Sequence, residues 1–344
     1  MTLAVSYASG PSDKPLLGST IGKFFDYAAG RYAEREAVVS IHQQVRFTYS
    51  QLAERVNKLA KALISAGFQK GDRIGIWSPN NVQWLITQYA TAKAGLILVT
   101  INPAYRSHEL AYVLRQSGCK GLILQNNLRS SNYEQMLCEL CPELPNVPTG
   151  KLVSIEYEYL TTIISTTESS VSGIYNWTDF NDLSNDSSDQ DLDARLNSQD
   201  MDDPINIQYT SGTTGFPKGA TLSHHNILNN GYFVAETMNF DESDRLVVPV
   251  PLYHCFGMVM ANLGCLTHGA CAIYPSETFE PEAVLHAVQS ERATALYGVP
   301  TMFIAELALP NFSEYDLKTL RTGIMAGAPC PVDTMTQVNE RMNM

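Results

Sequence analysis

The sequence predicts an α/β protein with layered, mainly parallel sheets, and three observations support this class. Short apolar runs alternate with helix-like segments of about a dozen residues, which is typical of strands joined by helical crossovers. The 344 residues include 44% hydrophobic and 17% charged residues, the balance of a globular chain with a large core. Because single cores stop growing near about 250–300 residues, we expect more than one lobe.

The first half of the chain carries the clearest elements. Thr48 and Gln51 fit a capping box, and the apolar spacing that follows continues to Gly67, a suitable C-terminal cap. Strand, helix, strand, helix and short strand are then expected at 73–77, 81–94, 97–101, 107–117 and 121–124. This order predicts a first α/β sub-domain over 21–164, after a flexible tail at 1–20.

Residues 165–203 interrupt this pattern. Ser, Thr, Asn and Asp dominate the segment, which has ten acidic residues and one basic residue, Arg195. This composition predicts an exposed acidic loop or insertion, and a loop that binds a partner is the alternative. Most of the net charge of −12 falls here. The acidic balance argues against a nucleic-acid surface, because phosphate backbones need clustered Lys and Arg, so no nucleic-acid partner is expected.

A second α/β sub-domain is expected over 204–344. Strands are predicted at 205–209, 246–250, 295–297 and 323–325, with a helix near 281–292. Residues 246–276 contain no charged side chain, but Pro249, Pro251 and several glycines interrupt them. A buried strand–helix–strand therefore explains them better than a membrane span, and no transmembrane segment is expected. The chain ends at Met344 shortly after a strand, so this lobe is expected to be incomplete.

The seven cysteines form no disulfide or metal framework. Cys138 and Cys141 make a Cys-x-x-Cys pair, but no second pair or Cys/His cluster follows at zinc spacing. We interpret them as structural or incidental thiols, and no metal ligands are predicted. The first 22 residues contain one base, Lys14, and no apolar signal core, so no targeting presequence is visible.

The most informative run follows the strand predicted at 205–209. It reads Thr210, Ser211, Gly212, Thr213, Thr214, Gly215, Phe216, Pro217 and Lys218. Glycines allow the backbone to approach a ligand closely, and exposed N–H groups, hydroxyls and one ammonium suit phosphate oxygens. The run does not match the common Walker pattern, because Pro217 precedes the lysine and Gly219 follows it. A Gly/Thr turn without chemical function is the alternative.

Several motifs together resemble the adenylate-forming superfamily of acyl-CoA synthetases, luciferases and peptide-synthetase adenylation domains. These motifs are the 210–218 run, Asn102-Pro103-Ala104-Tyr105, Pro251-Leu252-Tyr253-His254-Cys255-Phe256-Gly257, Tyr297-Gly298-Val299-Pro300-Thr301 and Ala326-Gly327-Ala328-Pro329. The likeness extends over most of residues 20–344. The sequence between the motifs is most similar to the mitochondrial medium-chain branch called acyl-CoA synthetase family member two.

The resemblance implies a fold and a reaction. The fold would be the large N-terminal domain of these enzymes, present in part. Such enzymes use ATP, with Mg²⁺, to convert a carboxylic acid to an acyl-adenylate, and coenzyme A then displaces AMP to give a thioester. A medium-chain fatty acid is the implied acid. Mitochondria are the implied compartment, and the cytoplasm is the alternative because no presequence is visible.

The resemblance also implies roles for individual residues. Thr210 to Lys218 match the loop that holds the β- and γ-phosphates, where Lys218 supplies charge. Gly327, Ala328 and Pro329 match the segment beside adenine, and His254 matches a position beside the reacting carboxylate. Its alternative is a hydrogen-bonded core histidine. Four residues could line an apolar tunnel for the acyl chain: Tyr253, Phe256, Met258 and Met260. A plain core helix is the alternative for the same residues.

Other family elements do not occur in these 344 residues. They are a Tyr-Gly-x-Thr-Glu motif, a ribose-binding Asp and a mobile C-terminal domain with its Lys. We therefore expect a chain of these residues to have no ligase activity alone. The alternatives are a truncated product that binds nucleotide or a partner without catalysis, an incomplete gene model, and an adenylate former for another acid such as a coumarate. Protein partners are not predicted.

Overall fold

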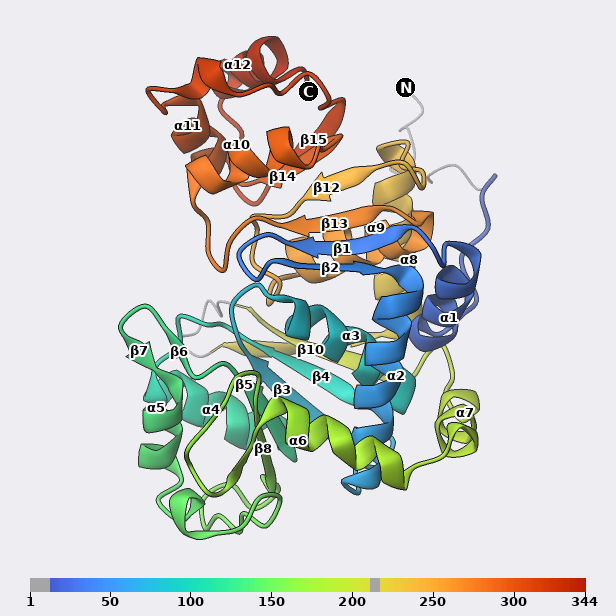
Figure 1. Cartoon of the computed structure of the whole chain (residues 1–344), viewed down its shortest axis with the longest axis vertical. Coiled ribbons are helices and arrows are strands. Elements are labelled where there is room, and N and C mark those ends of the chain that lie inside the picture. Colours follow the sequence, from blue (N-terminus) through green and yellow to red (C-terminus); the bar gives the residue numbers. More distant parts are fainter. Residues whose placement is uncertain (1–12, 211–216) are drawn as a thin grey trace, which may run out of the picture.

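The computed structural model describes residues 13–210 and 217–344, which form an α/β fold with two mainly parallel sheets (Figure 1). The six-stranded sheet has the order β15 (Thr322–Met325), β14 (Ala295–Gly298), β12 (Arg245–Val247), β13 (Cys271–Tyr274), β1 (Glu36–Ser40) and β2 (Val45–Thr48). The seven-stranded sheet has the order β11 (Lys218–Ser223), β10 (Pro204–Thr210), β4 (Ile97–Ile101), β3 (Arg73–Trp77), β5 (Gly121–Leu124), β8 (Thr162–Ser165) and β9 (Ile174–Tyr175). Each sheet has one antiparallel pair, β1 with β2 and β10 with β11, so the predicted fold class is confirmed.

Helices follow most of the strands. Their bounds are α1 (Ile21–Arg31), α2 (Tyr49–Ser65), α3 (Val82–Ala94), α4 (Ser107–Ser117), α5 (Tyr133–Leu140), α6 (Trp177–Asp182), α7 (Asp189–Asn197), α8 (His224–Thr237), a π-helix η3 (Phe256–Leu263), α9 (Gly264–His268), α10 (Pro281–Ser290), α11 (Pro300–Leu307) and α12 (Val332–Met342). A small hairpin joins β6 (Asn127–Leu128) to β7 (Ser131–Asn132), and the short helices are η1 (Leu144–Asn146), η2 (Leu183–Asp186) and η4 (Phe312–Glu314). None of the described helices is long and apolar enough to cross a membrane.

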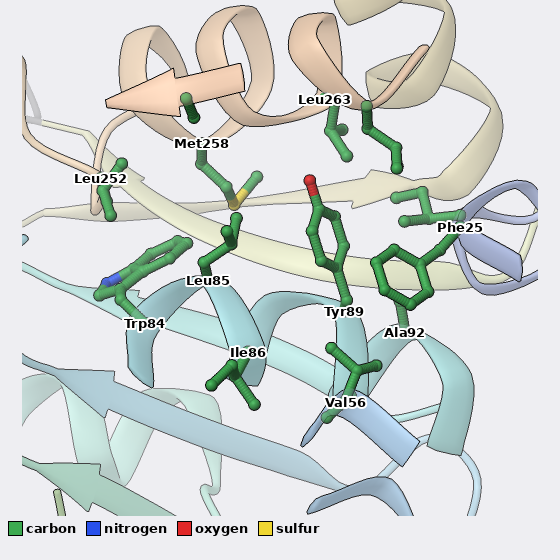
Figure 2. Packing of buried hydrophobic residues seen from close by; sticks show 14 of the residues in the cluster. Phe25, Val56, Trp84, Leu85, Ile86, Tyr89, Ala92, Leu252, Met258 and Leu263 are labelled. Atoms are coloured by element: carbon green, nitrogen blue, oxygen red, sulfur yellow. The ribbon is translucent and has the colours of Figure 1, made fainter. Parts of the chain in front are cut away.

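Helix α3 lies between the two sheets and joins their cores (Figure 1). From this helix Trp84 and Leu85 point toward Leu252 and Met258, and Tyr89 points toward Leu263, all in the second half of the chain (Figure 2). The Tyr89 hydroxyl donates a hydrogen bond of 3.0 Å to the Asn262 carbonyl oxygen. The helix is buried on nearly all sides, and its buried polar side chains have partners, as where Gln88 donates a 3.1 Å hydrogen bond to the Met258 carbonyl oxygen.

The two predicted sub-domains, 21–164 and 204–344, do not correspond to the two sheets. Strand β1 pairs with β13, and β10 pairs with β4, so each sheet takes strands from both predicted units. Local spacing identifies a strand but carries no information about a partner more than 100 residues away. The two sheets therefore do not follow the predicted boundary, and the division into sub-domains stays a prediction.

The expected acidic loop at 165–203 is wrong in part, because α6, η2 and α7 lie within it. Its few apolar residues are placed inward, and Phe180 and Leu192 are buried. Ser188 begins α7 with a capping box. Acidic side chains also find basic partners on α2, since Lys58 contacts Asp182 at 2.7 Å. Composition alone underestimated this order because a helix on a core needs only one apolar face.

The uncharged segment 246–276 is a buried strand–helix–strand, as predicted. It runs from β12 through the π-helix and α9 to β13. The π-helix is unusual, since such turns are rare and frequently occur at functional sites.

Candidate active site

A cleft of about 490 Å³ lies where the carboxyl ends of strands from both sheets meet. Ligands of open α/β sheets bind at this edge. The lining comes from the chain after β3, β4, β12 and β13 and from the β6–β7 hairpin. It consists of Pro79, Asn80, Asn102, Pro103, Ala104, Arg106, Leu128, Arg129, Ser130, Ser131, Pro249, Pro251, Tyr253, Glu277, Thr278, Phe279 and Met302.

Two arginines give the cleft positive charge. Arg106 donates a 2.8 Å hydrogen bond to the Ser131 hydroxyl, and Arg129 donates one of 3.1 Å to the Thr278 hydroxyl. Both partners are neutral, so neither guanidinium is neutralised by these contacts. The carboxylate of Glu277 lies in the same lining and accepts a 2.9 Å hydrogen bond from Gln125. The cleft therefore offers two cations and one carboxylate.

The glycine-rich run forms the connection of an antiparallel hairpin. Thr210 is the last residue of β10 and lies opposite Lys218, the first residue of β11. Ser211, Gly212, Thr213, Thr214, Gly215 and Phe216 lie outside the described residues, and their predicted roles stay predictions. Pro217 is fixed through its carbonyl oxygen, which accepts a 3.1 Å hydrogen bond from the Tyr112 hydroxyl. Lys218 is exposed, so its ammonium is available to an anion.

His254 is exposed to solvent just before the π-helix. Its Nδ1 atom accepts a 3.2 Å hydrogen bond from the Phe256 backbone N–H and lies 3.5 Å from the Cys255 sulfur. Desolvation by the surrounding protein lowers the pKa of His254 below its ordinary value. The ring is therefore neutral near pH 7, and because Nδ1 accepts, Nε2 carries the proton. An exposed N–H at Nε2 can donate to a ligand oxygen.

Gly327, Ala328 and Pro329 follow β15 and are exposed. Gly327 has a φ of +86°, a conformation that favours glycine, and a Cβ atom there would lie 3.2 Å from Val299. The Ala326 N–H donates a 3.2 Å hydrogen bond to the Gly298 carbonyl oxygen, which fixes the start of this segment beside β14. The backbone is thus left open on one side.

The predicted residues flank the cleft more than they line it. Among the described residues, Tyr253 is in the lining, whereas Lys218, His254 and 327–329 are not. The hairpin and the histidine segment do approach each other, because Gln208 on β10 lies 3.8 Å from the Met258 sulfur on the π-helix. Sequence reasoning missed Asn80, Arg106 and Arg129. Their signal was available, since each is a polar residue soon after a predicted strand or motif.

The structure separates the four residues considered for an acyl tunnel. Tyr253 lines the cleft, and Met258 is buried in the core beside Leu85 (Figure 2). Phe256 is buried with its ring centroid 5.3 Å from that of Tyr297, and Met260 is half-buried. The burial of Met258 and Phe256 agrees with the core alternative, and the acyl tunnel stays a prediction.

The cysteines remain free thiols in the structure. Cys138 is half-buried and Cys141 is buried. Across 13–210 and 217–344, no three His, Cys, Asp or Glu side chains are grouped so that they could hold a metal ion.

The fold and the site define an α/β protein with a polar cleft at the carboxyl edge of parallel sheets. The family model for AMP-binding enzymes matches residues 25–344. The chain is 46% identical over 329 residues to the putative acyl-CoA synthetase YngI of Bacillus subtilis (strain 168), covering 96% of this chain and 60% of that protein. It is 42% identical over 347 residues to the mitochondrial medium-chain acyl-CoA ligase ACSF2 of Homo sapiens, covering 99% of this chain and 56% of that protein. The chain belongs to the AMP-binding enzyme family.

A solved structure has the same fold. The anthranilate CoA ligase AuaEII, in complex with anthranoyl-AMP, superposes with a TM-score of 0.81 at 23% identity, covering 98% of this chain and 60% of that one. The chain thus spans somewhat more than half the length of the relatives it matches.

Proposed function

We propose that the protein carrying this sequence activates a medium-chain fatty acid with ATP and transfers the acyl group to coenzyme A. The identity to acyl-CoA ligases supports this proposal, and the observation that carries it is the hairpin between Thr210 and Lys218 at the carboxyl edge of the sheet. In the first step a carboxylate oxygen of the fatty acid bonds to the α-phosphorus of ATP. The bond from that phosphorus to the oxygen that bridges the α- and β-phosphates breaks. Pyrophosphate leaves with the electron pair of the broken bond, and an acyl-adenylate remains.

Lys218 is proposed to stabilise the phosphates that leave. Its exposed ammonium stands at the end of the hairpin, beside backbone that the Tyr112 hydroxyl holds through Pro217. Charge-assisted hydrogen bonds from such a group are stronger than neutral ones and strengthen as charge moves onto pyrophosphate. His254, neutral with its proton on Nε2, is proposed to donate to an oxygen of the reacting carboxylate or phosphate.

The second step requires coenzyme A, for which we propose the cleft. Arg106 and Arg129 present guanidinium groups held by neutral hydroxyls, and guanidinium matches phosphate geometry. The thiol sulfur of coenzyme A attacks the acyl carbon, the bond from that carbon to the AMP oxygen breaks, and the thiol proton leaves with the products. Tyr253 lies in the same lining, toward the segment that carries His254.

ATP and Mg²⁺ are proposed to arrive together. The open backbone after Gly327 suits a flat base, because no side chain at that glycine crowds it. The described residues hold no group of metal ligands, so we propose that the ATP phosphates carry the ion. A mitochondrial site of action is proposed because the human relative is a mitochondrial ligase, and imaging of the tagged full-length protein tests it.

The test is a substrate panel with the full-length protein. Pyrophosphate release and acyl-CoA formation are measured with octanoate, a coumarate and an amino acid, each with and without coenzyme A. The proposal predicts ATP-dependent pyrophosphate release with octanoate and a thioester only when coenzyme A is added. A preference for the coumarate would show that the acid is not a medium-chain fatty acid. Nucleotide binding without turnover of any acid would favour the non-catalytic alternative.

A further inference from the structure

The chain between β12 and His254 contributes to both the core and the cleft. Val248, Val250 and Leu252 are buried in the core, whereas Pro249, Pro251 and Tyr253 line the cleft. The backbone bends at Val250 and turns at Leu252 and Tyr253, and the His254 N–H donates a 3.3 Å hydrogen bond to the Pro251 carbonyl oxygen. This turn leads from Tyr253 in the cleft lining to His254.

This segment cannot make a normal strand ladder. The Val248 N–H still donates a 2.8 Å hydrogen bond to the Ile273 carbonyl oxygen on β13. Pro249 and Pro251 have no N–H, so two of the next four residues cannot donate. A buried N–H or C=O left between them would cost about 1–3 kcal/mol if it found no partner. The segment therefore needs a partner from outside the sheet.

Asn80 supplies that partner with one side chain. Its Nδ2 atom donates a 3.0 Å hydrogen bond to the Val250 carbonyl oxygen, and its Oδ1 atom accepts one of 2.9 Å from the Leu252 N–H. A carboxamide has the same donor and acceptor as a peptide group, so Asn80 takes the place of a peptide group on a neighbouring strand. Its side chain is 4% exposed, which excludes water as a competitor.

Asn80 is itself held firmly between the two sheets. Its backbone N–H donates a 3.2 Å hydrogen bond to the Glu277 carbonyl oxygen, in the loop after β13. The next residue, Asn81, caps α3 by accepting a 2.8 Å hydrogen bond from the Trp84 N–H. Helix α3 lies buried between the sheets, so the Asn80 carboxamide has a fixed origin.

We propose that Asn80 is a positioning residue for acid activation. Its carboxamide bridges the Val250 carbonyl oxygen and the Leu252 N–H, fixes the backbone at the start of the turn, and thereby places Tyr253 in the cleft and orients the His254 ring. This inference rests on the proposed function, because it assumes that the segment serves the acyl-activating reaction. No contact of Asn80 with a reacting atom is required.

The test compares Asn80→Ala with a matched control, Asn206→Ala. Asn206 is as buried as Asn80 and also bonds a backbone carbonyl, that of Leu98 at 2.8 Å, but it lies at the start of β10 away from 248–254. Both variants are made in the full-length protein, and octanoate-dependent pyrophosphate release is measured at saturating ATP, together with the KM values, the thermal midpoint and hydrogen exchange of the Leu252 amide. N80A should lower kcat at least tenfold, leave the KM for ATP unchanged and speed exchange at Leu252. N206A should lose similar stability and keep its kcat.

The outcomes separate the two proposals. An active wild type with equal kcat in N80A and N206A overturns the role of Asn80 and leaves the proposed function standing. A wild type that releases no pyrophosphate with any acid overturns the proposed function instead. If N80A does not fold, Asn80→Ser replaces it, because its hydroxyl is too short to bridge Val250 and Leu252. A normal kcat in N80S then contradicts the inference.

Discussion

Thr210 and Lys218 face each other across the β10–β11 hairpin, and the Thr210 hydroxyl lies 3.5 Å from the Lys218 carbonyl oxygen. Thr210 ends β10 and Lys218 begins β11 at the carboxyl edge of the seven-stranded sheet. The Lys218 side chain is exposed there.

The first prediction concerns His254 and pH. Desolvation lowers the pKa of His254 from its ordinary value of 6.5, so the neutral ring dominates above that pH. If the neutral ring with its proton on Nε2 is the active donor, protonation of His254 should not change the rate of pyrophosphate release between pH 6.5 and 8. The rate should fall at lower pH, where the ring becomes protonated. His254→Ala should lower the rate about 100-fold, the typical loss for one such donor, and should remove the acid limb. A pH profile of H254A that keeps the wild-type acid limb would contradict this role.

The second prediction concerns an ion-pair network that ties β1, β2, β12 and α10 together. Arg46 contacts Glu291 at 2.8 Å, and Arg245 contacts Glu291 and Glu36, each at 2.6 Å. The hydrogen bond from Arg46 lowers the pKa of Glu291, and it outweighs the desolvation that would raise it. Glu291→Gln should cost about 1–2 kcal/mol near pH 7, since hydrogen bonds to charged groups contribute amounts of this order.

The pH dependence of this network follows from the sign of the shift. Because the folded pKa of Glu291 is depressed, its contribution is present above the ordinary carboxyl pKa of 4.5 and is lost as pH falls through the folded value. The difference in thermal midpoint between wild type and E291Q should therefore shrink from pH 6 toward pH 3. Glu156→Gln in the exposed pair with Arg115 is the control and should have no resolvable effect. A constant difference across this range would exclude the proposed linkage.

The third prediction distinguishes a core methionine from a substrate contact. Met258 is 1% exposed, and its carbonyl oxygen accepts a 3.1 Å hydrogen bond from Gln88 on α3. Met258→Ala should destabilise the protein by about 2–5 kcal/mol, the usual cost of removing this side chain from a core. The order of preference among fatty acids should not change. A shift toward bulkier acids with little loss of stability would place Met258 in the acyl pocket instead.

The fourth prediction concerns the arginines of the cleft. Arg129→Ala should raise the KM for coenzyme A several-fold in thioester formation and leave pyrophosphate release without coenzyme A unchanged, because the first step does not use the cleft cations. Arg292→Ala, on the turn after α10 and outside the cleft lining, is the control. Equal effects of R129A on both steps would indicate a general disturbance of the fold.

Local elements could be predicted from the sequence because their signals are local. The capping box of Thr48 and Gln51 begins α2 as expected, and Gly67 follows the end of α2 with a φ of +85°. The strand Arg73–Trp77 was also predicted with its correct bounds. Spacing and caps depend on neighbours within one or two turns, so a single sequence contains them.

Non-local features could not be predicted in this way. Pairing of β1 with β13 joins residues more than 200 positions apart, and the sequence around Val38 does not specify Ala272 as its neighbour. The same limit explains why Asn80 was missed. The proposed role of Asn80 rests on its hydrogen bonds to the backbone of Val250 and Leu252, which lie about 170 positions further along the chain and are brought beside it only by the fold. The site motifs were found through family resemblance, and their partners in space were not.

The proposed function depends most on the role of Lys218. The decisive measurement is octanoate- and ATP-dependent pyrophosphate release by the wild type, Lys218→Ala and Lys151→Ala, with the thermal midpoint of each. Both lysines are exposed, but Lys151 lies far along the chain from the hairpin, in the loop before β8. K218A should lose at least tenfold in rate, as expected for one charge-assisted hydrogen bond of about 1.5–3 kcal/mol, at an unchanged midpoint. K151A should match the wild type. Unchanged release in K218A, or a loss of rate that parallels a loss of stability, would contradict the phosphate-binding role.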